Sequence, residues 1–230
     1  MYGPLLRKSD FWWMDAVNLK MTELLRKVLE GKGAMCSKSA DDLMPFDRPT
    51  PEQAMQSGHK IRLASVALPL FRRENEWCIS LMKRTEYPGV HSGQISIPGG
   101  EVERQDRSRL ETAIREFREE MGVDLQPESL VSGLSERYIP PSKFAVSTYI
   151  AVLSEEPKWQ IDSQEVAGVL TIPVSELLKE GALRATPIEI QTGVLVSLPA
   201  YHWQGEVIWG ATAIILTEFA MVWSEMKALL

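Results

Sequence analysis

Three glutamates on one predicted helix are the residues of this chain best placed to do chemistry. Glu116, Glu119 and Glu120 stand at positions i, i+3 and i+4, which share one side of an α-helix. Like charges at this spacing repel one another, so the cluster needs a compensating positive charge. Arg115 can neutralise Glu119 four residues on. The rest of the charge suits Mg²⁺ or Mn²⁺, which prefer oxygen ligands and keep waters for substrate phosphates.

A glycine turn precedes this helix and offers a further metal ligand. We expect Pro98-Gly99-Gly100 to form a turn, and the backbone carbonyl of Gly100 could complete the metal shell because glycine permits a close approach. The alternative is that residues 115–120 are simply a solvated helix face held by i, i+4 ion pairs, which is the usual meaning of a Glu-rich helix.

The limits of the helix are encoded locally. Ser108 and Glu111 form the capping pattern S-x-x-E, and Gly122 stands where a left-handed residue ends a helix, so the helix is predicted over 109–121. Its apolar residues fall on a second face, which we expect to turn toward the core: Leu110, Ala113, Ile114, Phe117 and Met121.

Together these residues resemble the Nudix box, G-x5-E-x7-R-E-U-x-E-E-x-G-U, in which U is a bulky aliphatic residue. Gly100 and the run from Arg115 to Val123 match the box, Asp106 takes the place of its first Glu, and the gap before Arg115 is one residue longer. This longer gap is similar to that of the coenzyme A diphosphatase branch. The branch's upstream motif is matched at Arg84, Gly93 and residues 98–100 but not at Gly89 and Ile97, and the resemblance extends over about residues 61–226.

The resemblance implies roles for these residues. Glu116, Glu119, Glu120 and the Gly100 carbonyl would bind Mg²⁺ or Mn²⁺, and Arg115 would orient a carboxylate, so that Arg115 and Glu119 act in catalysis. Family members also use a carboxylate from a loop outside the box to activate water. Glu165 is our candidate for this base or for an extra ligand. Glu136 and Glu206 compete with it, and Glu165 as a plain surface residue is the other interpretation.

Four residues upstream of the helix are candidates for substrate binding: Arg84, His91, Gly93 and Gly99. Arg84 ends a predicted strand beside the glycine turn, where its guanidinium could pair with a phosphate, or else with the acidic box. His91 lies in a loop between glycines and is either a substrate contact or a turn residue.

The surrounding pattern indicates one mixed α/β domain. The resemblance implies a Nudix-type α/β/α sandwich with a mixed sheet between helices, over residues 61–230. Residues 1–60 would add an N-terminal helix, 13–30, ended by Gly31, and an extended arm, 32–60. Strands are predicted at 61–71, 77–83, 94–97, 130–139 and 144–153, an apolar turn at 169–172, helices at 174–180 and 211–226, and Trp77, Trp209 and Trp223 in the core.

Composition limits the partners. A net charge of −6 and a pI near 5.3 argue against nucleic-acid binding. We expect no membrane span, because no run of about 18 uncharged apolar residues occurs. With only Cys36 and Cys78 and no targeting signal, a cytoplasmic location is expected. Trp12 and Trp13 could pack on the domain or join two copies in a homodimer.

These features predict a metal-dependent Nudix pyrophosphohydrolase acting on a nucleoside diphosphate-linked small molecule. The expected substrate is coenzyme A or an acyl derivative. One alternative keeps the reaction and changes the substrate to ADP-ribose or a dinucleotide. The other is a catalytically silent Nudix domain that senses a ligand.

Overall fold

The computed structural model describes residues 8–43, 48–58, 60–88, 91–190 and 193–229, with side chains from residue 16 onward. The side chains of Trp12 and Trp13, and Gly89, therefore lie outside the described residues. Among the helices that are described, none is long and apolar enough to cross a membrane.

An eight-stranded mixed sheet forms the centre of the molecule. Its main path runs β3-β2-β1-β7-β5, while β4 pairs with β1, β6 with β7 and β8 with β2. The pair β1–β7 is parallel and the other pairs are antiparallel. The strands are β1 (Arg62–Arg73), β2 (Glu76–Arg84), β3 (Ile95–Ser96), β4 (Gly99–Glu101), β5 (Leu130–Ser132), β6 (Arg137–Ile139), β7 (Phe144–Val152) and β8 (Val166–Pro173).

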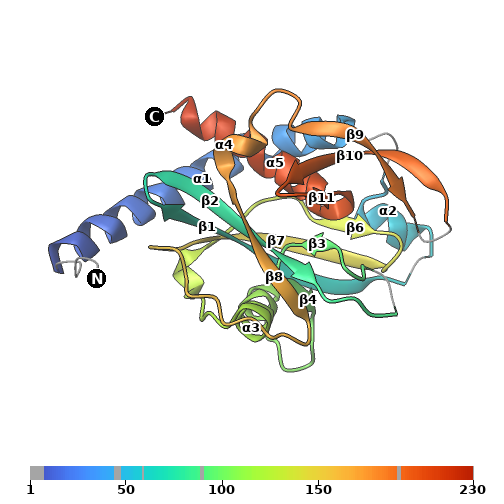
Figure 1. Ribbon diagram of the computed structural model, residues 1–230, viewed down its shortest axis with the longest axis horizontal. Coiled ribbons are helices and arrows are strands. Elements are labelled where there is room, and N and C mark those ends of the chain that lie inside the picture. The colour runs from blue at the N-terminus through green and yellow to red at the C-terminus, as the bar shows by residue number, and fades with distance from the viewer. Residues whose placement is uncertain (1–7, 44–47, 59, 89–90, 191–192, 230) are drawn as a thin grey trace.

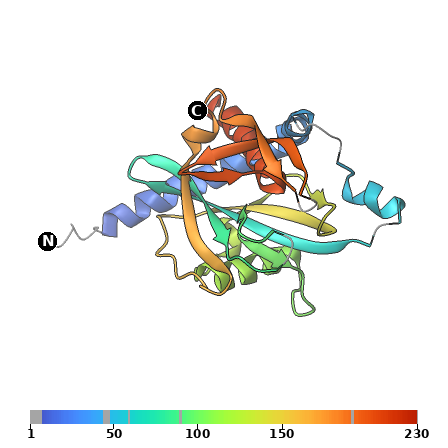
Figure 2. The same ribbon diagram turned by 45° about the vertical axis from the view of Figure 1, so that its right-hand side comes forward.

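Helices cover both faces of this sheet, which confirms the predicted α/β/α arrangement (Figures 1 and 2). Helix α3 (Arg109–Met121) packs on one face, where Phe117 and Met121 meet Ala67 of β1. Helices α1 (Lys8–Asp42) and α5 (Gly210–Lys227) lie on the other face, over Leu68 and Leu70 of the same strand. This alternation along β1 follows from the two-residue period of a strand.

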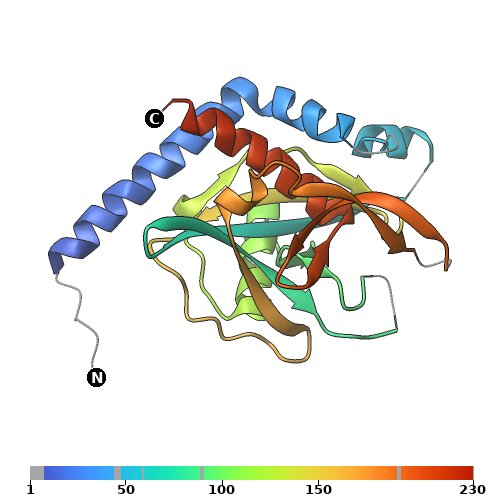
Figure 3. The same cartoon turned by 45° about the horizontal axis from the view of Figure 1, so that its top comes forward.

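The N-terminal segment differs from its prediction, because helix α1 does not stop at Gly31 but continues to Asp42. Its second half buries Leu29, Gly33, Cys36 and Ala40 at helical spacing, mostly against α5. Beyond Leu29 the buried residues Gly33, Cys36 and Ala40 are small, so this part of the sequence shows no obvious apolar stripe. Packing outweighs the cost of about 1 kcal/mol for each helical glycine. The helix bends in this half (Figure 3), as glycine pairs permit.

The predicted extended arm over 32–60 is wrong, because its first part belongs to α1 and because a second helix, α2 (Pro51–Gln56), forms within it. Thr50 caps this helix in a full capping box with Gln53, a local signal that the sequence contained and that we did not use. The short helix packs beside β6 and carries the chain from α1 to the start of β1.

Three further corrections concern strands. Gly99 and Gly100 of the expected turn lie in strand β4, which pairs with β1, and the expected apolar turn at 169–172 lies in strand β8, which pairs with β2. Residues 183–208, where we predicted no strand, form a second sheet of β9 (Leu183–Glu189), β10 (Leu195–Trp203) and β11 (Glu206–Ile208). Pro187 and Pro199 lie in these strands, and they weakened the strand prediction because proline is rare in the interior of a sheet. The helix predicted at 174–180 is the shorter α4 (Val174–Leu177).

A glycine substitution tests the continuous helix α1. Gly31 is exposed, and a Cβ atom there would meet nothing within 4 Å. We expect Gly31→Ala to raise the free energy of unfolding by about 0.5–1 kcal/mol, the difference in helix propensity. Chemical denaturation measures it. Gly133→Ala is the contrasting variant and should destabilise, because its φ is +133° and its Cβ would lie 3.0 Å from that of Leu29. A destabilised Gly31→Ala would contradict a helix through residue 31.

Candidate active site

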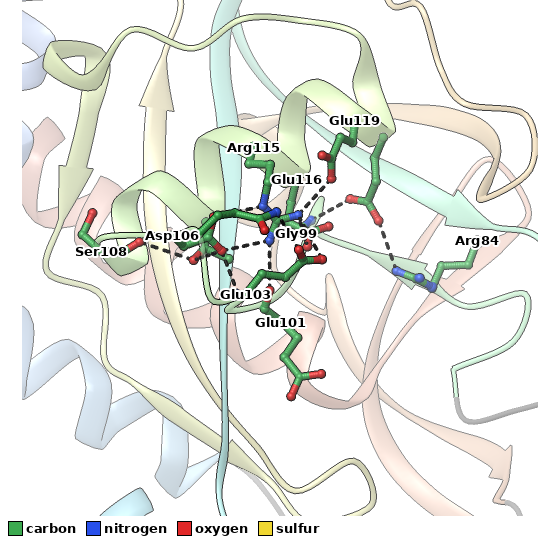
Figure 4. A network of polar contacts seen from close by, with 12 residues as sticks. Arg84, Gly99, Glu101, Glu103, Asp106, Ser108, Arg115, Glu116 and Glu119 are labelled. Carbon is green, nitrogen blue, oxygen red and sulfur yellow. Dashed lines mark hydrogen bonds and ion pairs between the residues drawn. The ribbon is translucent and has the colours of Figure 1, made fainter.

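Two glycines of strand β4 bring the carboxylates of helix α3 to the edge of the sheet. The Gly99 N–H donates a hydrogen bond to Glu120 Oε2 at 2.7 Å (Figure 4). A Cβ on Gly100 would lie 2.5 Å from the carboxylate carbon of Glu116, so that carboxylate lies directly against the glycine backbone. Gly99 has a φ of +146°, which favours glycine, and a Cβ there would lie 2.2 Å from the Ser65 carbonyl oxygen. Larger residues at either position would push strand and helix apart.

Arg115 fixes the helix relative to the loop that precedes it. Its guanidinium binds Asp106 bidentately, with two N···O distances of 3.0 Å, and also donates to the Glu101 carbonyl at 3.0 Å (Figure 4). Its remaining nitrogen donates to Glu116 at 2.8 Å and to Glu119 at 2.9 Å. The hydrogen bonds from Arg115 lower the pKa of Asp106 from 3.8 to about 2. Arg115 therefore holds two glutamates in place while the carboxylate of Asp106 balances its charge.

The carboxylate of Glu120 is buried in a site that disfavours its charge. The residue is 2% exposed, and burial raises its pKa from 4.5 to about 8. The Gly99 N–H and Arg84 act against this, while the charges of Glu116 and Glu165 raise the pKa further. Burial also raises the pKa of Glu116. A positive ion between these carboxylates would stabilise their charged forms and so lower their pKa values.

The carboxylates face a large cavity. It has a volume of about 1060 Å³, and Glu116, Glu120, Glu165, Arg84 and His91 all line it. Its apolar walls come from β1, β7 and α5, so it lies on the face of the sheet opposite the body of α3. Drug-sized ligands occupy pockets of about 300–1,000 Å³, so this cavity has room for a nucleotide-sized molecule.

Not every predicted site residue reaches this cavity. The side chain of Glu119 is 52% exposed and pairs with Arg115, so only two of the three box glutamates line the cavity. Gly93, with a φ of +65°, serves the loop by donating from its N–H to the Thr85 carbonyl at 3.2 Å. His91 lines the cavity, and its Nδ1 lies 3.0 Å from Gln94 Oε1.

The position of Arg84 combines the two interpretations of its role. Its side chain lines the cavity at the end of β2, and its guanidinium nitrogen lies 3.5 Å from Glu120 Oε1 (Figure 4). At that distance the ion pair is weak, so the guanidinium remains available to a phosphate beside the carboxylates.

The three candidate bases differ in whether they line the cavity. Glu165 comes just before β8 and lines the cavity. Glu136 instead accepts a hydrogen bond from Ser147 Oγ at 3.2 Å and pairs with Arg109, and Glu206 pairs with Lys83 at 2.6 Å. Neither of these two lines the cavity.

The residues fit a hard divalent cation, although they do not form a finished metal site. The structured part of the chain contains no ready-made group of three or more His, Cys, Asp or Glu side chains that could hold a metal. However, Glu116 and Glu120 present oxygen donors to one cavity, and the charge of Glu165 raises the pKa of both carboxyl groups. Gly100 leaves the space that a side chain would fill. A cation binding there would need to draw in Glu119 or Glu165, or rely on water and substrate oxygens.

Sequence reasoning missed parts of the cavity wall. Trp209, which we assigned to the core, is half-buried and lines the cavity with the first turn of α5, residues 210–212. The signal was present, because residues 208–212 are part of the family resemblance. Arg48 and Lys60 also line the cavity, and no motif in their surroundings pointed to them.

The chain is similar to known proteins in both sequence and fold. The NUDIX domain model matches residues 61–190. A protein called uncharacterized Nudix hydrolase NudL from Enterobacter sp. (strain 638) is 31% identical over 165 residues, which cover 70% of this chain and 82% of the relative. Its namesake from Yersinia enterocolitica is 30% identical over 76% and 87% of the two chains. In fold, the chain is similar to the crystal structure of a MutT/nudix family protein from Enterococcus faecalis, with a TM-score of 0.51 and 19% identity over 72% of this chain and 63% of that one.

The ion pair between Asp106 and Arg115 predicts a pH-dependent stability. Because the folded pKa of Asp106 is lowered from 3.8 to about 2, its contribution is present above pH 4 and is lost as the pH falls through 2. We expect the stability difference between wild type and Asp106→Asn to shrink by about 2 kcal/mol between pH 7 and pH 2, measured by urea unfolding. Asp124→Asn is the control, since that side chain is 75% exposed. A difference that stays constant over this range would contradict the pairing.

Proposed function

The chain belongs to the Nudix family, and we propose that it hydrolyses the diphosphate of a nucleotide-linked small molecule with divalent cations held by Glu116 and Glu120. The family and the relatives make it a pyrophosphohydrolase. The observation that carries the proposal is that the two box glutamates and Arg84 line one cavity large enough for a nucleotide. A catalytically silent sensor is the less favoured function, because it would not need buried carboxylates whose charges repel each other.

The substrate that we propose is coenzyme A or an acyl derivative. Cleavage would release a nucleoside 3′,5′-bisphosphate and a phosphopantetheine fragment. Support comes from the match of Arg84, Gly93 and residues 98–100 to the motif of the coenzyme A diphosphatase branch, and from the longer gap before Arg115. The departures at Gly89 and Ile97 favour testing ADP-ribose and dinucleotides beside it.

The residues at the acidic end of the cavity, and Arg115 beside it, have proposed parts in the reaction. Glu116 and Glu120 would hold Mg²⁺ or Mn²⁺, with the Gly100 carbonyl as a further ligand. Arg115 keeps Glu116 and Glu119 oriented through the contacts described above. When bound, such cations neutralise phosphate oxygens and lower the pKa of water.

The other side chains act on the substrate itself. Arg84 pairs with a phosphate oxygen of the diphosphate beside Glu120, and His91 contacts the substrate from its loop. The carboxylate of Glu165 takes the proton from the water that attacks phosphorus. The P–O bond to the bridging oxygen then breaks, and that oxygen leaves with the second phosphate.

A substrate panel tests the proposal. Purified protein with saturating Mg²⁺ or Mn²⁺ is incubated with coenzyme A, acetyl-coenzyme A, ADP-ribose and diadenosine polyphosphates, and the products are identified by mass. We expect turnover of the coenzyme A compounds to adenosine 3′,5′-bisphosphate and the phosphopantetheine fragment. Faster turnover of ADP-ribose than of coenzyme A would identify ADP-ribose as the better substrate and leave the proposed reaction unchanged. No hydrolysis of any diphosphate would favour the sensor.

The Glu120→Gln variant tests the carboxylate in the same assay. We expect kcat to fall by about 10²–10³-fold, the usual cost of losing one group that stabilises transition-state charge. Without metal, the melting temperature should equal or exceed that of wild type, because a carboxyl with a raised pKa no longer has to ionise in a buried site. Glu155→Gln is the exposed control. Unchanged turnover in Glu120→Gln would refute its metal role.

A pair of variants tests the proposed base. We expect Glu165→Gln to lower kcat by about 10²–10⁴-fold with little change in KM, the range for a general base. The matched control is Glu206→Gln, because the carboxylate of Glu206 pairs with Lys83 away from the cavity. The kcat of this control should stay within about twofold of wild type. The reverse pattern would move the role to Glu206.

A further inference from the structure

The cavity has two ends of opposite charge. Glu116, Glu120 and Glu165 line one end beside Arg84, as described above. Four basic residues line the cavity elsewhere: Arg48, Lys60, Arg62 and Lys143. None of them belongs to the Nudix box, and nothing in the reaction at the acidic end uses them.

Strand pairing gathers these basic residues at the start of β1. The Arg62 N–H donates to the Lys143 carbonyl at 2.9 Å, and Arg62 pairs in register with Phe144 of β7. The Arg62 guanidinium lies 4.3 Å above the Phe144 ring. Lys60 precedes Arg62 by two residues, and its charge is close enough to lower the pKa of Glu101.

Arg48 joins the same end from the N-terminal segment. It lies between α1 and α2, and α2 packs beside β6, whose Ile139 is paired with Phe144. Burial lowers the pKa of Arg48, and the nearby charge of Arg137 lowers it further, while Asp41 raises it. Arg48 thus brings a half-buried guanidinium group to this wall of the cavity.

The acidic side chains at this end do not balance the basic ones. Of the four carboxylates that the described residues contribute to the cavity, Glu101 is at the basic end, where it binds Arg62 bidentately. Lys60 and Lys143 are exposed and line the same cavity. Lys60, Arg62 and Lys143 thus meet one carboxylate, Glu101, at this wall, which leaves a net positive surface that attracts anions.

The two ends are separated by a length of one strand. Gly99 of the acidic end pairs with Val66, which is four residues along β1 from Arg62. At about 3.3 Å per residue, Arg62 lies on the order of 10–13 Å along the sheet from Gly99. A ligand that reaches both ends must carry anionic groups roughly that far apart.

We propose that Arg48, Lys60, Arg62 and Lys143 bind a phosphate monoester that the substrate carries in addition to the diphosphate that is cleaved. A phosphate monoester has about −1.5 to −2 charge and three acceptor oxygens, which suits several converging cations better than a carboxylate does. Arg48 and Lys60 would then belong to the active site, although the family model begins at residue 61. The inference rests on the proposed function in one respect, namely that this cavity binds the substrate.

Metal-free binding tests the subsite without turnover. Isothermal titration in EDTA compares adenosine 3′,5′-bisphosphate and adenosine 2′,5′-bisphosphate with AMP, so that the shared 5′-phosphate cancels. We expect wild type to bind one or both of the two bisphosphates at least 10-fold more tightly than it binds AMP. Lys60→Gln/Lys143→Gln should reduce that ratio to below threefold and leave the affinity for AMP unchanged. Arg48→Gln should act in the same direction, with its melting temperature measured to confirm folding.

The control is Lys38→Gln, an exposed cation on α1 outside the cavity, which should keep the wild-type ratio. Equal binding of AMP and both bisphosphates by wild type, or an equal loss for all three ligands in the double variant, would overturn the inference.

Turnover separates this inference from the proposed function. The ratio of kcat/KM for coenzyme A to that for 3′-dephospho-coenzyme A should fall about 10-fold in Lys60→Gln/Lys143→Gln. Selective bisphosphate binding with no hydrolysis of any diphosphate would reject the proposed function and keep the subsite. Hydrolysis with no selectivity in either assay would keep the function and reject the subsite.

Discussion

The close approach of helix α3 to strand β4 is the constraint on which the site depends. Gly99 and Gly100 allow the carboxylates of Glu120 and Glu116 to lie against the strand backbone, and Arg115 fixes the helix from its other side through Asp106. The arrangement places charge where burial disfavours it, which raises the pKa of Glu120 to about 8. A site of this kind is strained without a ligand, and that strain is the physical reason to expect a cation there.

Local signals predicted the elements that carry the chemistry. Ser108 and Gly122 cap α3 at the two ends expected from the sequence, and its apolar face packs on the sheet. The i, i+4 spacing correctly predicted the ion pair between Arg115 and Glu119, but spacing alone could not show that Glu119 does not line the cavity. Nor could it choose among three distant acidic residues for a base, because that choice depends on which loop reaches the cavity.

What the sequence could not predict lies mostly in tertiary contacts. Gly33, Cys36 and Ala40 extend α1 only because α5 and Gly133 accept small side chains at close range, and no local pattern announces this. The second sheet was hidden by prolines at positions 187 and 199. Arg48 and Lys60 carry no motif, and they become interesting only when the fold places them beside Arg62 and Lys143.

The pairing of α1 with α5 has a consequence for how the molecule is made on the ribosome. The buried stripe of α1, with Leu25 and Val28, is synthesised before every strand of both sheets, whereas helix α5, which covers it, is synthesised after them. Until residues 210–227 leave the exit tunnel, that stripe has no permanent cover and is open to chaperones or to aggregation. The core on this face therefore closes only after residues 210–227 have been made, whereas the α3 face can assemble earlier.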